Sequence, residues 1–251
     1  MKVLMLNGSP HAKGCTYTAL HEMEKIFRQE GISCELIQVG QEAVRGCIAC
    51  GQCRKLGRCV FTTDSVNLVL EKWENADALI LGSPVYYASA NGTFTAFLDR
   101  LFYAAAFDKR YKLGAAVVSC RRGGASATFD QLNKYFTISS MPIVSSQYWN
   151  SVHGNTPEEV LQDQEGLQTM RTLARNMSYL LKCLELGRLS CRCRKGNPGL
   201  RRISSADRQK NLEPQIFLRL LFSDKLKLYP FISRAKAKAC ATDATLREAA
   251  A

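Results

Sequence analysis

The 251-residue sequence lacks a long apolar run and contains only three histidines, His11, His21 and His153. No apolar stretch approaches the roughly 20 residues that cross a bilayer, and the apolar start of the chain is too short for the core of a secretion signal. The histidines are too scattered for a shared metal site, and neither a Ser-His-Asp arrangement nor paired carboxylates emerge. These absences argue against a transmembrane protein or a hydrolase and favour a cytoplasmic protein.

The positive charge is concentrated at one end of the chain. Residues 188–251 hold 15 of the 34 basic and 5 of the 22 acidic residues, a net charge of +10 out of the total of +12. The first 187 residues are therefore nearly neutral, at +2. Because one segment causes the basicity, the total charge is weak evidence for nucleic-acid binding, and we expect none.

Residues 188–251 form a basic C-terminal extension that contains few large apolar residues in its first part, so we expect it to be flexible. Ile216–Phe231 mixes apolar and basic residues. Such a segment would suit an anionic membrane surface, docking on the main domain, or no selected role at all. Cys191 and Cys193 in the extension are weak candidates for additional ligands.

Residues 1–187 alternate short apolar runs with helical patterns, which predicts one α/β domain. The expected strands are Val3–Leu6, Cys34–Val39, Ala78–Leu81, Gly114–Cys120 and Pro142–Gln147. The expected helices are Tyr17–Gln29, Ser65–Glu74 capped by Asp64, Phe94–Phe107, Ser126–Phe136, and one from the cap Thr156 to Leu186 with Gly187 as its stop. This alternation favours a doubly wound, five-stranded parallel sheet, whose ligands bind at the carboxyl ends of the strands.

The loop after the first strand reads NGSPHAKGCTYT, Asn7–Thr18. Its glycines let backbone N–H groups approach an anion, its hydroxyls add donors, and the start of the following helix supplies positive dipole. The loop matches neither the Walker A pattern nor GxGxxG, so a single phosphate such as that of FMN fits better than a dinucleotide. An ordinary strand-to-helix turn remains the alternative.

A second loop, GSPVYYASANGTFTAFLDR at 82–100, follows the third expected strand. Tyr86 and Tyr87 come directly after a proline and a valine at the end of that strand. Backbone at this position could reach the polar edge of a flavin ring while an aromatic side chain covers the face of the ring. Alternatively, the two tyrosines are core or interface residues.

Four cysteines are crowded into GCIACGQCRKLGRC at 46–59, with the spacing Cys-x2-Cys-x2-Cys-x5-Cys. In a cytoplasmic protein, such cysteines indicate thiols, metal ligands or redox centres more often than disulfides. Iron–sulfur clusters use compact runs of this kind, whereas zinc ribbons usually separate two CxxC pairs by more residues. A zinc site and a redox-active Cys47–Cys50 dithiol remain alternatives.

Taken together, four stretches resemble the NADPH-dependent FMN reductase family, and more narrowly its iron–sulfur flavoprotein branch. They are GSPHAKGCT, the cysteine run followed by TTDS, GSPVYY with TFTAFLDRLF, and RRGGASATFDQLNKYF. The resemblance implies a flavodoxin-like fold with strand order 2-1-3-4-5, non-covalently bound FMN, and a homodimer or homotetramer. Residues 1–187 would form the FMN-binding domain, with a cysteine-containing insertion at 46–60.

The resemblance also implies the site residues. The FMN phosphate would be held by Ser9, His11, Cys15 and Thr16, and the flavin ring bordered by Pro84, Val85, Tyr86, Tyr87, Gly123 and Gly124. A [4Fe–4S] cluster would be held by Cys47, Cys50, Cys53 and Cys59. Family members often carry Arg at the position of His11 and Asn at that of Cys15, and the loss of the permanent charge predicts weaker phosphate binding.

The implied function is that of an FMN-dependent oxidoreductase, either an NAD(P)H-dependent FMN reductase or an iron–sulfur flavoprotein. Electrons would come from NAD(P)H or ferredoxin and leave to a small-molecule acceptor such as a quinone, free flavin or oxygen. Flavin chemistry needs no side-chain general acid, so we expect no catalytic side chain. The alternatives are a non-enzymatic flavodoxin-like electron carrier, an FMN reductase whose cysteines are redox thiols, and a redox-sensing nucleic-acid-binding protein.

Overall fold

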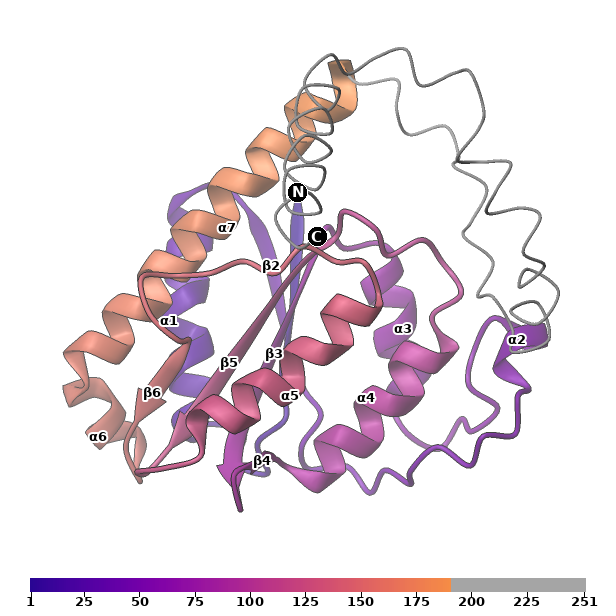
Figure 1. Cartoon of the computed structure of the whole chain (residues 1–251), viewed down its shortest axis with the longest axis horizontal. Helices are drawn as coiled ribbons and strands as arrows, with labels where there is room; N and C mark the ends of the chain where they lie inside the picture. The colour runs from indigo at the N-terminus through magenta and orange to yellow at the C-terminus, as the bar shows by residue number, and fades with distance from the viewer. Residues whose placement is uncertain (191–251) are drawn as a thin grey trace, which may run out of the picture. The chain divides into compact units, whose positions relative to one another are not determined.

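The computed structural model describes residues 1–190 (Figure 1), and the side chains of residues 1–187. The expectations for the basic extension, including Cys191, Cys193 and Ile216–Phe231, lie outside the described residues. The chain divides into two units, Met1–Arg192 and Cys193–Ala251, and the described residues all belong to the first.

The core of this unit is a parallel sheet with strand order β2-β1-β3-β5-β6. Its strands are β1 (Lys2–Asn7), β2 (Ser33–Gln38), β3 (Ala78–Tyr86), β5 (Leu113–Cys120) and β6 (Ser151–His153). A two-residue strand, β4 (Ser89–Ala90), pairs with the end of β3 in an antiparallel hairpin. The order confirms the flavodoxin-like arrangement that was expected, 2-1-3-4-5.

Alternate residues of each central strand face the two sides of the sheet. Val3 and Met5 pack with α1 (Cys15–Gln29), α6 (Pro157–Gln162) and α7 (Gln164–Ser190). Leu4 and Leu6 pack on the other side, and the helices that cover this side are α3 (Val66–Glu74), α4 (Gly92–Ala104) and α5 (Ala125–Ile138). Figure 1 shows the two sets of helices on opposite faces. Because both faces are covered, the central strands are apolar throughout.

The fifth strand was expected at Pro142–Gln147, and this expectation is wrong. Residues 142–147 contribute one bridge, between Ile143 and Gly114, and the strand that joins the sheet is β6. Beyond the bridge, the Ser146 hydroxyl donates to the Tyr148 carbonyl at 2.6 Å, and the chain turns. The Asn150 amide donates to the Ala116 carbonyl of β5 at 3.1 Å, which aligns the chain for pairing one residue later.

The last predicted helix is divided in two. It begins as expected, with Thr156 as its cap accepting from the Glu159 N–H at 3.3 Å. It is interrupted at Asp163, whose carboxylate accepts from the His153 N–H at 2.7 Å and from the Gly166 N–H at 2.9 Å. The second of these bonds caps α7, which continues through Gly187 to Ser190, so Gly187 does not end the helix.

The boundaries of the other elements agree with the prediction to within a few residues, except that β3 extends further, to Tyr86. The short α2 (Cys53–Leu56) lies within residues 46–60, the cysteine segment. Among the residues described, no helix is both long and apolar enough to cross a membrane.

Gly114 allows α5 to approach β5 closely, which generates a prediction about stability. A Cβ atom at Gly114 would lie 2.5 Å from Cδ1 of the fully buried Phe136. We therefore expect Gly114→Ala to lower the free energy of unfolding by about 1–3 kcal/mol through overpacking, as measured by urea denaturation.

The matched control is Gly187→Ala, within α7, where a Cβ would meet no described atom within 4 Å. A helix-interior alanine is favoured over glycine by roughly 0.5–1 kcal/mol, so this variant should be slightly stabilised. Equal stabilities of the two variants would contradict both the close approach and the continued helix.

Candidate functional site

Three loops meet where β1, β3 and β5 end. Because these strands are parallel, their carboxyl ends lie at one edge of the sheet, which is also where β4 lies in Figure 1. The first two loops are bonded directly, since the Gly8 N–H donates to the Gly82 carbonyl at 2.8 Å. The sequence prediction of a shared loop edge therefore agrees with the topology.

Asn91, the N-cap of α4, ties the first loop to the second. Its side-chain amide donates to the Gly8 carbonyl at 2.8 Å, and its Oδ1 accepts from the Thr93 N–H at 3.1 Å. Its backbone N–H donates to the Ser83 hydroxyl at 3.1 Å. Asn91 is only 8% exposed, so water does not compete for these hydrogen bonds. Asn91 therefore holds the two loops in one arrangement.

The first loop ends at the start of α1, where Gly14 is the N-cap and no described side chain caps the helix. The first N–H groups of a helix lack intrahelical acceptors, so those of Cys15 and Thr16 are available to an anion. The Ser9 hydroxyl is buried and accepts from the His11 N–H at 3.1 Å. His11 itself is exposed.

The side chains of two predicted phosphate ligands already have hydrogen-bond partners within the protein. The Thr16 and Ser119 hydroxyls are 2.8 Å apart and buried, which joins the first loop to the end of β5. The Cys15 thiol donates to the Gly154 carbonyl at 3.7 Å, and burial raises the pKa of this thiol. The side chains of both residues are thus engaged within the protein, whereas their backbone N–H groups lie in the uncapped first turn of α1.

The third loop, residues 121–124 between β5 and α5, contacts the second through Gly124. It has a φ of +88°, and a Cβ there would lie 2.7 Å from the Cα of Ala88. Tyr86 and Tyr87 are both exposed, Tyr87 fully, and Tyr87 has a positive φ of 51°. An exposed tyrosine in this strained conformation is consistent with a ligand-facing position. The half-buried Pro84 and Val85 and the exposed Gly123 complete the predicted ring-binding set along these loops.

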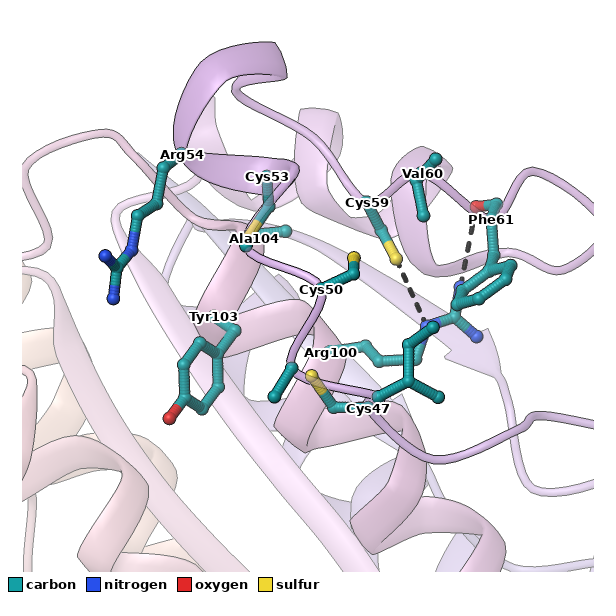
Figure 2. A pocket seen from close by; sticks show the side chains of 13 residues that line it. Cys47, Cys50, Cys53, Arg54, Cys59, Val60, Phe61, Arg100, Tyr103 and Ala104 are labelled. Atoms are coloured by element: carbon teal, nitrogen blue, oxygen red, sulfur yellow. Dashed lines mark hydrogen bonds between the residues drawn. The ribbon is translucent and has the colours of Figure 1, made fainter.

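The four clustered cysteines line one cavity of about 150 Å³ beside α4. Figure 2 shows their sulfur atoms gathered round it. Cys47 and Cys50 are exposed, whereas Cys53 and Cys59 are half-buried and pack against the core. The structure thus brings together the four residues predicted as ligands.

Different kinds of metal centre hold their thiolate ligands at different distances from one another. Within residues 1–190, no three His, Cys, Asp or Glu side chains are close enough to bind one metal ion. A single zinc ion with Zn–S distances of about 2.3 Å holds its thiolates about 3.8 Å apart in a tetrahedron. A centre built from several iron and sulfide atoms separates its thiolates further.

Cys59 is held more firmly than the other three cysteines. The Asn67 side chain accepts from the Cys59 N–H at 2.9 Å and donates to its carbonyl at 3.0 Å. Arg100 donates from Nε to the Cys59 sulfur at 3.3 Å, as the dashed line in Figure 2 shows. Cys59 therefore has both its backbone and its thiol fixed.

Sequence reasoning missed Arg100. This residue of α4 is 2% exposed, and its side chain forms a buried ion pair with Asp64. Burial acts to lower the pKa of Arg100, but hydrogen bonds to Asp64 and Cys59 outweigh it and raise that pKa. Asp64 was predicted as a helix cap; Ser65 is the N-cap, although Asp64 accepts from the Val66 N–H at 3.2 Å. A charged residue within the apolar face of a helix was the available signal.

The cysteines outside the cluster differ in burial. Cys34 and Cys120 are half-buried and buried, as expected of core residues, and burial raises the pKa of both thiols. Cys183, by contrast, is exposed on α7.

Comparison with known proteins identifies relatives over most of the described unit. A family model of NADPH-dependent FMN reductases matches residues 1–156. An iron–sulfur flavoprotein of Methanocaldococcus jannaschii is 32% identical over 193 residues, covering 74% of this chain and 100% of the relative. One of Methanosarcina thermophila is 27% identical, covering 75% of this chain and 99% of the relative.

Solved structures show the same fold at low sequence identity. RosB with a bound riboflavin-phosphate intermediate has a TM-score of 0.58 at 15% identity, covering 80% of this chain and 94% of RosB. An NAD(P)H:quinone oxidoreductase of Methanothermobacter marburgensis has a TM-score of 0.54 at 16% identity, covering 70% of this chain and 96% of that one. At such identities the likeness establishes the fold alone, which agrees with the strand order.

The contacts of Asn91 predict a measurable stability loss. Asn91→Ala removes the helix cap and the bond to Gly8, and we expect it to lower the free energy of unfolding by about 2 kcal/mol. Asn91→Ser keeps a capping hydroxyl but cannot reach Gly8, so its loss should be smaller, about 1 kcal/mol. Urea denaturation measures both, and wild-type stability in both variants would show that Asn91 does not hold the loops.

Proposed function

The chain belongs to the NADPH-dependent FMN reductase family, and on this basis we propose that it is an FMN-dependent oxidoreductase with a [4Fe–4S] cluster. The observation that carries the proposal is the placement of four cysteines round one cavity in a chain whose sheet-edge loops are joined to one another. When bound, FMN supplies hydride and electron transfer and the cluster supplies one-electron transfer. The protein's own residues bind and orient these groups.

The proposed FMN site lies at the joined loops. The N–H groups of Cys15 and Thr16 at the start of α1 would donate to the phosphate, where the helix dipole also favours negative charge. The buried hydroxyls of Ser9 and Thr16 maintain the loop conformation. The flavin ring would lie along residues 84–87 and 123–124, where the backbone is close to the surface.

The proposed cluster ligands are Cys47, Cys50, Cys53 and Cys59. Two of them are exposed, so the cavity is accessible for assembly of a cluster. Gly57 has a φ of 66° and ends α2, which returns the chain from Cys53 towards Cys59. Cys53 and Cys59 thereby line the same cavity.

The surroundings of the cysteines suit a negatively charged electron donor. Arg54, Lys55 and Arg58 are exposed, and the sequence has no acidic residue between Glu42 and Asp64. Positive potential on this surface would attract the phosphates of NAD(P)H or an acidic ferredoxin. We propose one of these as the donor, a small molecule as the acceptor, and a homodimer or homotetramer as the assembly.

One alternative has a specific observation in its favour. Cys47 and Cys50 are exposed free thiols, so they could instead cycle as a dithiol in an FMN reductase that has no cluster. A flavodoxin-like carrier would bind FMN without turnover of NAD(P)H.

An anaerobic absorption spectrum with iron and sulfide analysis tests the proposal. We expect flavin bands, a broad cluster absorption that reductant bleaches, and about four iron and four sulfide per chain. Cys50→Ala should remove the broad absorption and most of the iron while leaving the flavin bands. The matched control is Cys183→Ala, at the exposed cysteine of α7, which should retain both groups.

Each other outcome favours a different function. FMN without iron or sulfide in the wild-type protein would favour redox thiols. A wild-type protein that holds both groups but turns over no NAD(P)H with any acceptor would favour the carrier. A colourless protein that cannot be reconstituted with FMN would contradict the proposal as a whole.

The position of His11 predicts how FMN affinity can be increased. Because His11 is exposed in the phosphate loop, His11→Arg should add a permanent positive charge beside the phosphate and lower the FMN dissociation constant about tenfold. The gain should shrink at high salt, because exposed charges are screened. Flavin fluorescence quenching measures it.

Riboflavin, which lacks the phosphate, is the control ligand. Its dissociation constant should be the same for wild type and His11→Arg. An equal gain with riboflavin and FMN would place the effect of residue 11 on the ring rather than on the phosphate.

A further inference from the structure

All five N–H groups of Arg100 are used, and all five acceptors lie in residues 45–64. Nε donates to the Cys59 sulfur at 3.3 Å. The two Nη atoms donate to the two carboxylate oxygens of Asp64, and to the carbonyls of Arg45 and Phe61, both at 3.4 Å. A guanidinium has five donors in a fixed plane, so none remains for water or another group.

These acceptors stand at both ends of the cysteine segment. Arg45 precedes Cys47, whereas Cys59, Phe61 and Asp64 follow the third cysteine. Arg100 itself belongs to α4, whose inner side chains are packed in the core. The Arg100 side chain thus joins the two ends of the cysteine segment to each other and to the sheet domain.

We propose that Arg100 is a positioning residue for the cluster: it clamps the cysteine segment closed, and its bond to Cys59 raises the reduction potential of the cluster. This inference rests on the proposed iron–sulfur function. Reduction adds negative charge to the cluster and its sulfur ligands, so an N–H donor to a ligand sulfur stabilises the reduced form more than the oxidised form. The fixed positive charge of Arg100 also stabilises the reduced form and so raises the reduction potential.

Arginine is required at this position by its shape. Lysine would keep the positive charge but has three donors on one atom, which cannot reach Cys59, Asp64 and two carbonyls together. The role is also separate from FMN binding, since Arg100 lies nine residues along α4 from its cap Asn91, about 14 Å at 1.5 Å per residue. Variants of Arg100 can therefore be compared at equal FMN content.

The first experiment is a redox titration of the reconstituted holoprotein with dithionite, at matched iron content. At a fixed potential near the wild-type midpoint, Arg100→Gln should show a reduced-to-oxidised ratio about tenfold lower, which is a shift of about 59 mV for a one-electron couple. Arg100→Lys should lie between this variant and wild type. Arg110→Gln is the control, since it breaks an exposed pair with Asp108 and should not shift the ratio.

The second experiment is limited trypsin digestion, which does not depend on the cluster. Trypsin cleaves after Arg and Lys, and the segment offers Arg45, Arg54, Lys55 and Arg58. In FMN-loaded protein without iron, Arg100→Gln should be cut first within this segment, and severalfold faster than wild type or Arg110→Gln. If Arg100→Gln does not fold, Arg100→Lys replaces it in both experiments.

An unchanged potential together with an unchanged digestion rate would overturn the inference. Wild-type protein that binds FMN but takes up no iron would instead contradict the proposed cluster, and with it the effect on potential. In that case the digestion rates alone would support or refute the clamp. A failure of the role of Arg100 is thereby distinguished from a failure of the proposed function.

Discussion

The cysteine segment depends on one buried charge. Most of residues 46–60 is loop, with a single short helix, so backbone pairing does little to fix it. Arg100 and Asp64 compensate each other in the core at 1% and 5% exposure of their side chains. Removing one partner of such a pair typically costs about 3–5 kcal/mol, because the other charge is left buried and unpaired. The geometry of the cavity is therefore tied to the stability of the domain.

At the edge of the sheet, by contrast, glycines allow the loops and the neighbouring backbone to approach one another closely. A Cβ at Gly8 would lie 2.3 Å from the Phe94 ring, and one at Gly40 would lie 2.3 Å from the Ser9 carbonyl. With these glycines, the loops are close enough for Asn91 and the Thr16–Ser119 pair to join them. The two parts of the site are thus held independently, one by charge and one by close backbone packing.

The sequence was sufficient for features that depend on local pattern. Apolar runs such as Val3–Leu6 predicted the strands apart from the last one, and the family resemblance implied their order, from which the loops at the sheet edge followed. Features that depend on distant partners could not be predicted. The break at Asp163 requires the His153 N–H, and the role of Arg100 requires a carboxylate 36 residues earlier in the chain. Only its position on an apolar helix face was visible in advance.

Two kinds of positive charge surround the cysteines, and they should act on different steps. Arg54, Lys55 and Arg58 are exposed, so their field is screened within a Debye length of about 8 Å at physiological salt. They can influence the encounter with an anionic donor, and this influence falls as salt rises. Arg100 is buried and hydrogen-bonded to a sulfur, so its field is little screened. If the proposed cluster is present, salt should therefore change the rate at which electrons arrive more than the reduction potential of the cluster.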